Sequence, residues 1–148
     1  MNRVQSRILL IVLVLGALVA APSFGHGGNR LIGSWISTSA VDGGGELQTL
    51  WTFNRGGTVV VSSSGANFSA AHGAWEKVGP RTFEVVNTAF GFAPDGSLAF
   101  TLENRATFEV SQDRQTFTAV FESEVKALDG TVLSTSSGSA TGTRINVH

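Results

Sequence analysis

The chain has 148 residues, no cysteine, and an almost balanced charge of ten Lys and Arg against eleven Asp and Glu residues. The lack of cysteine excludes a disulfide framework, so the fold must be held by its hydrophobic core. Nucleic-acid binding needs clustered Lys and Arg, and so does attraction to an anionic membrane surface. We therefore expect no nucleic-acid partner.

The first residues are typical of a signal peptide. Arg3 and Arg7 precede an uncharged apolar run, Ile8–Ala21. This run is shorter than the roughly 20 residues of a membrane-spanning helix but long enough for the hydrophobic part of a signal peptide. The small residues that follow suit cleavage after Gly25, or alternatively after Ser23.

The sequence thus predicts a signal peptide at residues 1–25 and one exported domain at residues 26–148. The domain is expected to be secreted or periplasmic, with no stable membrane insertion after cleavage. The alternative is an uncleaved N-terminal anchor. Loss of two arginines with the signal leaves the mature domain mildly acidic.

After residue 26, apolar and polar residues alternate in short segments, and turns rich in Gly and Asp-Gly separate the segments. This pattern predicts eight strands: Leu31–Thr38, Glu46–Phe53, Thr58–Ser62, Gly73–Val78, Arg81–Ala89, Ser97–Val110, Thr116–Ala127 and Thr131–Ile145. Within the last segment, Ser134–Thr143 consists of Ser, Thr, Gly and Ala. We predict a strand there rather than a frayed tail, because apolar residues flank it. Phe90–Phe92 is expected in a connection, either as a flap over a cavity or as a tucked loop.

The alternation also separates the two faces of the sheet. In Ser97–Val110 the even positions are mostly apolar, and the odd positions carry Thr, Glu and Arg. An antiparallel sheet with one apolar face must cover that face, and the sequence offers no helix to do so. We therefore predict an all-β fold, an antiparallel up-and-down barrel of about eight strands.

Two short features resemble the lipocalin (calycin) signature. Gly33-Ser34-Trp35 lies on the first predicted strand, and Arg144 lies at the end of the last. The resemblance implies that Arg144 crosses the indole face of Trp35 and closes one end of the barrel, since a guanidinium stacks well on an indole. The chain departs from the family in lacking a C-terminal helix and disulfides, so related allene-oxide-cyclase-like or dirigent-like barrels remain the alternative.

Two amides interrupt the inward apolar series, Asn87 and Asn104. A buried amide without a partner costs a few kcal/mol, so each must bond backbone, water or a ligand. One reading places them among inward aromatic residues that bind a small apolar ligand: Phe83, Phe100, Phe117 and Phe121. The other reading places them at a rim or bulge, where backbone satisfies them.

No motif for catalysis or metal binding emerges. His26, His72 and His148 are scattered without ligand spacing, and we expect no metal and no cofactor. The sequence favours an exported, lipocalin-like barrel that binds a small hydrophobic molecule. One alternative is a cofactor-free cyclase or isomerase that uses Asn87, Asn104 and Glu76, and another is a structural domain with a filled core.

Overall fold

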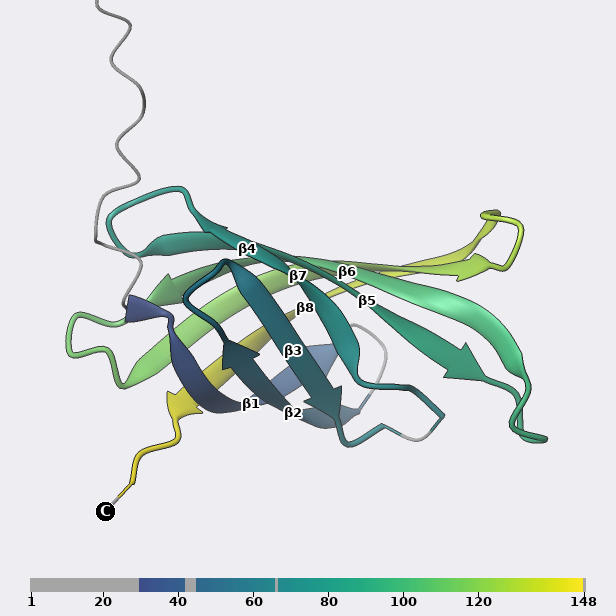
Figure 1. Cartoon of the computed structure of the whole chain (residues 1–148), viewed down its shortest axis with the longest axis horizontal. Coiled ribbons are helices and arrows are strands. Elements are labelled where there is room, and N and C mark those ends of the chain that lie inside the picture. The colour runs from purple at the N-terminus through teal and green to yellow at the C-terminus, as the bar shows by residue number, and fades with distance from the viewer. Residues whose placement is uncertain (1–29, 42–44, 66, 148) are drawn as a thin grey trace, which may run out of the picture.

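The computed structural model describes residues 30–41, 45–65 and 67–147, and the predicted signal peptide lies outside them. These residues form a closed antiparallel barrel (Figure 1) in which each strand pairs with the next and β1 pairs with β8. The strands are β1 (Gly33–Val41), β2 (Glu46–Phe53), β3 (Thr58–Ser63), β4 (Ala71–Lys77), β5 (Thr82–Phe92), β6 (Leu98–Val110), β7 (Thr116–Ala127) and β8 (Val132–Arg144). The predicted all-β up-and-down barrel is confirmed.

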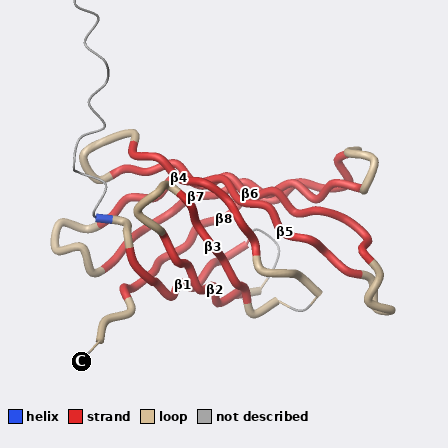
Figure 2. Tube along the Cα trace, in the orientation of Figure 1, coloured by secondary structure: helices blue, strands red, loops and turns tan. Residues whose placement is uncertain are grey.

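Strands make up most of the described chain, and short loops join them (Figure 2). Two connections use the expected Asp-Gly turns, where Gly96 and Gly130 have φ angles of +83° and +90°. Such left-handed angles suit glycine because it lacks a Cβ. In both turns the aspartate carboxylate accepts a hydrogen bond from the backbone N–H two residues later, at 2.9 Å. Within the described ranges, no helix is long and apolar enough to cross a bilayer.

The Ser/Thr/Gly-rich segment near the C-terminus is an ordered strand, β8, paired with both β7 and β1. Its glycines allow close packing inside the barrel. A Cβ on Gly142 would lie 2.3 Å from the ring of Phe117, and one on Gly138 would lie 2.3 Å from the carbonyl oxygen of Ala40. The small residues are therefore needed where β8 passes beneath aromatic rings and a neighbouring backbone.

The expectation that Phe90–Phe92 forms a connection was wrong, because β5 continues to Phe92. The register between β5 and β6 shifts at Gly91/Phe92. Gly91 permits this irregularity, since a Cβ there would overlap the ring of Phe100 at 2.0 Å. The segment is thus a bulged strand end covered by Phe100.

One end of the barrel is filled by large side chains. Trp35, Phe53, Phe83 and Phe117 are all at most 2 % exposed. Trp35 donates its indole N–H to the Leu31 carbonyl at 2.9 Å, and its ring meets Phe117 edge-on at a centroid distance of 5.4 Å. Aromatic pairs in this geometry add to the stabilisation from burial alone.

Arg144 covers the filled end, as the resemblance implied. Its guanidinium carbon lies 4.1 Å from the centre of the Trp35 ring. Its three nitrogens donate to the carbonyls of Arg30, Ile32 and Arg114 at 2.5–2.7 Å. Gly33 makes room for this arrangement, because a Cβ there would lie 2.6 Å from an Arg144 nitrogen. The filled end is therefore closed by one side chain of β8 that binds the segment before β1 and the turn between β6 and β7.

Candidate functional site: an interior cavity

The barrel interior contains a cavity of about 320 Å³, lined by residues from all eight strands and from the loop between β3 and β4. The lining is mostly apolar or small: Ser39, Leu47, Thr49, Trp51, Val61, Ser63, Gly65, Phe68, Ser69, Ala71, Asn87, Ala89, Leu102, Asn104, Ala106, Phe108, Ala119, Phe121, Ser123, Val125, Ser136 and Ala140. Its volume falls within the usual range for small-molecule sites, about 300–1,000 Å³.

The cavity exists because inward positions in this half of the barrel carry small side chains. Alanines at 71, 89, 106, 119 and 140 are buried and line it. An eight-stranded barrel has an interior just wide enough for ordinary side chains to fill. Replacing those side chains with Ala and Ser leaves space, whereas the Trp and Phe residues of the closed end leave none.

Two aromatic rings stand between the cavity and the closed end. Trp51 and Phe108 line the cavity and meet edge-on at a centroid distance of 5.1 Å. The Trp51 indole N–H donates to Ser37 Oγ at 2.9 Å, which satisfies its polar atom. These rings give the cavity a rigid aromatic wall.

Phe68 lies on the β3–β4 connection, near the far end of the site. It is 40 % exposed, lines the cavity, and meets the ring of Phe100 edge-on at 5.8 Å. Its backbone forms an isolated bridge to Gly91 on β5. The loop is thus held against the β5–β6 hairpin, so a half-exposed aromatic pair borders the cavity on this side.

Polar side chains form a row across the long strands. Asn87 on β5 lies opposite Asn104 on β6, Asn104 opposite Ser123 on β7, and Ser123 opposite Ser136 on β8. All four line the cavity. Asn87 and Asn104, the two amides predicted to interrupt the inward apolar series, are therefore direct cross-strand neighbours that face the same cavity.

The two amides differ in how they are satisfied. Asn104 Oδ1 accepts a hydrogen bond from Ser123 Oγ at 2.9 Å. Asn87 is only 5 % exposed, and its side-chain nitrogen makes no hydrogen bond to any described residue. Gly73 lies opposite it on β4, where a Cβ would lie 2.6 Å from the Asn87 Cα. A buried, unpaired amide N–H is unusual in proteins and calls for an explanation.

The structure divides the predicted site residues into three groups. Asn87, Asn104 and Phe121 line the cavity together. Phe83 and Phe117 instead pack in the closed half, where Phe83 meets Trp75 edge-on at 5.8 Å. Phe100 covers Gly91 and contacts Phe68 beside the cavity.

Sequence reasoning missed several lining residues, above all Trp51. Its signal was the alternation of Leu47, Thr49, Trp51 and Phe53 along one predicted strand. Glu76, named as a possible catalytic partner, is exposed on β4 and does not line the cavity. No group of three or more His, Cys, Asp or Glu residues suitable for a metal ion occurs within residues 30–41, 45–65 and 67–147.

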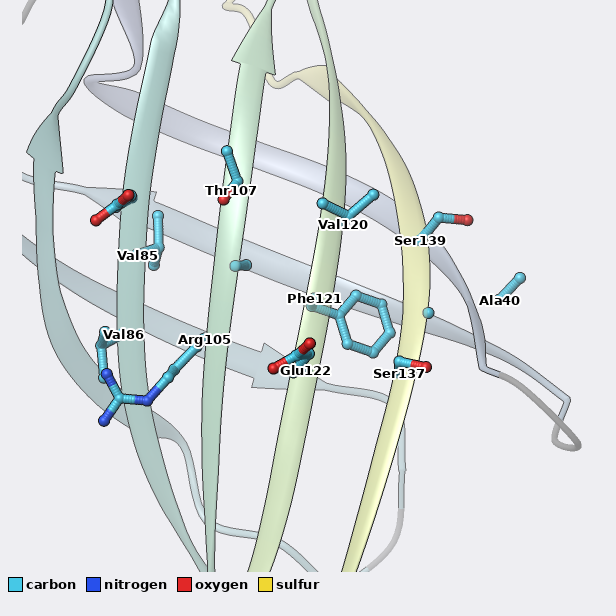
Figure 3. A pocket seen from close by; sticks show the side chains of 13 residues that line it. Ala40, Val85, Val86, Arg105, Thr107, Val120, Phe121, Glu122, Ser137 and Ser139 are labelled. Carbon is cyan, nitrogen blue, oxygen red and sulfur yellow. The ribbon is translucent and has the colours of Figure 1, made fainter.

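A second, more open depression of about 700 Å³ lies over β5–β8 (Figure 3). Its rim carries outward side chains of neighbouring strands, including Arg105, Val120 and Glu122, with Ala40 from β1 at one side. Val120 is 63 % exposed. Because a ligand here would stay largely in water, we take the interior cavity as the candidate site.

Among the described residues, the charged side chains lie on the outer face of the barrel or at its ends. Lys126 bridges Glu103 and Glu124 at 3.0 Å each, and Arg105 pairs with Glu103 at 2.5 Å. The hydrogen bond from Lys126 holds the pKa of Glu103 below its ordinary value, with a smaller contribution from Arg105. None of these groups lines the cavity.

No protein-family model matches the chain, and no curated protein matches it. Among solved structures it is similar to that of EF1p2_mFAP2b bound to DFHBI, with a TM-score of 0.58 and 16 % sequence identity. The match covers 80 % of this chain and 97 % of the other. At this identity the likeness concerns the fold. With the strand order, it defines the fold as an eight-stranded closed antiparallel barrel.

Proposed function

We propose that this protein is a binding module that holds one small, mainly apolar molecule in the barrel interior. The observation that carries the proposal is the 320 Å³ cavity, bounded toward the closed end by Trp51 and Phe108 and lined elsewhere by small and apolar residues. An apolar molecule that enters such a cavity leaves water and gains contacts on all sides.

The comparison supports this reading at the level of architecture. EF1p2_mFAP2b, a barrel of similar fold, has been solved with DFHBI bound. A barrel of this size can therefore accommodate a ligand, and here the interior residues are small enough to leave space for one. The features shared with lipocalins, Trp35 beneath Arg144 and the up-and-down barrel, fit the same role.

The proposal includes export. Its basis is the N-terminal sequence, with two arginines before an apolar run and small residues after it. Expression with the full N-terminus, followed by N-terminal sequencing of the exported product, should give a chain beginning at His26, or at Phe24 for the alternative cleavage. A product that retains Met1 in the cell membrane would support the anchor instead.

Binding can be tested by titrating the protein with N-phenyl-1-naphthylamine, an uncharged apolar fluorescent probe. Saturable enhancement with a stoichiometry near one is expected for the native chain. Ala119→Ile adds a larger side chain to the cavity wall and should abolish the enhancement, whereas Val120→Ile, on the exposed face of the same strand, should not. Equal binding by both variants, or no saturable binding by the native chain, would overturn the proposal.

A further inference from the structure

The composition of the cavity wall restricts the charge of the ligand. Among the described lining residues there is no Asp, Glu, Lys, Arg or His. A carboxylate or an ammonium group would lose its hydration in this cavity without meeting an opposite charge, which is strongly unfavourable. The salt bridges of β6 and β7 lie on the opposite face of the sheet and cannot supply one.

The hydrogen-bonding capacity of the polar row restricts the ligand further. The Asn104 side-chain oxygen already accepts a hydrogen bond from Ser123 Oγ. Asn87 retains two N–H donors and has no partner for them among the described residues. The side chain lines the cavity, and the torsion that turns an asparagine amide has broad preferences. The Asn87 amide can therefore turn its N–H groups toward a bound molecule.

The wall around this donor is apolar and partly aromatic. Ala89, Ala106 and Phe121 line the same cavity, and Phe108 and Trp51 form its inner end. A ligand that fills this space places most of its surface against carbon, and the amides of Asn87 and Asn104 face it on the β5–β6 side. Such a site resembles other small-molecule pockets, which combine apolar walls with a few placed polar groups.

From these observations we infer that the ligand is an uncharged, largely apolar molecule with a hydrogen-bond acceptor, such as a ketone, ester or amide carbonyl, which receives a hydrogen bond from the Asn87 amide. This inference rests on the proposed binding function and specifies its ligand class. Asn87 would act as the residue that orients the ligand and selects a carbonyl-bearing molecule over a hydrocarbon of the same shape.

The test compares three naphthalene derivatives of similar size by isothermal titration calorimetry: 2-acetylnaphthalene, 2-isopropenylnaphthalene and 2-naphthoate. The first two differ only in a carbonyl oxygen against a methylene group, and the third carries a negative charge. For the native protein, the ketone should bind about fivefold to tenfold more tightly than the alkene, the effect of one net hydrogen bond. The carboxylate should bind most weakly.

Asn87→Leu removes the donor and should bring the affinities for ketone and alkene together, mainly by weakening the ketone. Thr88→Val, on the exposed face of the same strand, is the matched control and should preserve the difference. The ligand comparison on the native protein tests the inference even if Asn87→Leu does not fold.

The outcomes separate the two proposals. If ketone and alkene bind equally to the native protein, or if the carboxylate binds best, the ligand class is wrong while the binding function stands. If Asn87→Leu keeps the full preference for the ketone, Asn87 is not the donor. If none of the three compounds binds, the proposed function itself fails.

Discussion

Replacing Asn87 by leucine is expected to stabilise the ligand-free protein. Asn87 is 5 % exposed and its side-chain nitrogen has no hydrogen-bond partner in the described structure. An unsatisfied buried polar group costs about 1–3 kcal/mol, and leucine removes that cost with a side chain of similar branching. The cavity beside position 87 provides room for the extra volume.

We therefore expect Asn87→Leu to raise the free energy of unfolding by about 1–3 kcal/mol. Urea denaturation followed by circular dichroism should show a higher midpoint with an unchanged slope, because the surface exposed on unfolding stays the same. In thermal unfolding, each kcal/mol should correspond to roughly 4 °C for a domain of this size. The exposed control Thr88→Val should change stability by less than about 0.5 kcal/mol.

A decrease in the free energy of unfolding of about 1 kcal/mol or more in Asn87→Leu would show instead that the native amide has a stabilising partner. A stabilised variant that also loses its preference for the ketone would show that position 87 favours ligand recognition at the expense of stability. Loss of function accompanying a gain in stability is typical of binding sites.

Four further predictions concern the rest of the barrel. Arg144→Lys, which loses the planar set of donors to three carbonyls, should lower the free energy of unfolding by about 1–3 kcal/mol in urea while leaving affinity for the uncharged probe unchanged; a parallel loss of affinity would contradict the separation of closed end and cavity. Gly142→Ala should destabilise the barrel by about 1–3 kcal/mol because its Cβ would meet the Phe117 ring, whereas Gly56→Ala, with nothing within 4 Å, should be nearly neutral; equal effects would refute the packing argument. Affinity for the uncharged probe should vary by less than about twofold between pH 5.5 and 8, because none of the described residues that line the cavity is ionisable in this range; a tenfold change would reveal a titrating group in the site. Since the pKa of Glu103 is lowered on folding, its contribution to stability is present above pH 4.5 and is lost as the pH falls through the lowered pKa. Glu103→Gln should therefore lower the free energy of unfolding by less than about 1 kcal/mol at neutral pH, by less in high salt, and not at all in strong acid.

The strands could be predicted from the sequence because their signals are local. Alternation along Ser97–Val110 and the Asp-Gly turns depend on neighbouring residues only, and the structure confirms β6 and both turns. The extension of β5 to Phe92 could not be foreseen in this way. It depends on Phe100, a residue of the next strand, lying over Gly91.

The juxtaposition of the two amides depends on the same irregularity. Phe92 pairs with Leu98 next to the hairpin turn. If the register continued from this pair without a shift, Asn87 would lie opposite Glu103, which belongs to the outer face. The shift at Gly91/Phe92 moves the pairing by one residue and sets Asn87 opposite Asn104. Alternation placed both amides on the inner face, but it could not locate the register shift that sets them opposite each other.

Alternation also could not separate the filled half of the barrel from the hollow half. Phe83 and Phe121 are both inward by pattern, yet Phe83 is fully buried in the core and Phe121 lines the cavity. The difference depends on which side chains of other strands lie at the same level. Next to Phe121 these include Ala106 and Gly138, which leave space.

Ligand binding in the interior cavity is tested most directly by an NMR titration of the ¹⁵N-labelled protein with 2-acetylnaphthalene. Binding inside the barrel predicts saturable shift changes at the backbone amides of Ala119 and Ala140 and at the side-chain amide of Asn87, all of which line the interior cavity. Shift changes confined to the outer depression, at Arg105 and Val120, would contradict it. So would the absence of any saturable change.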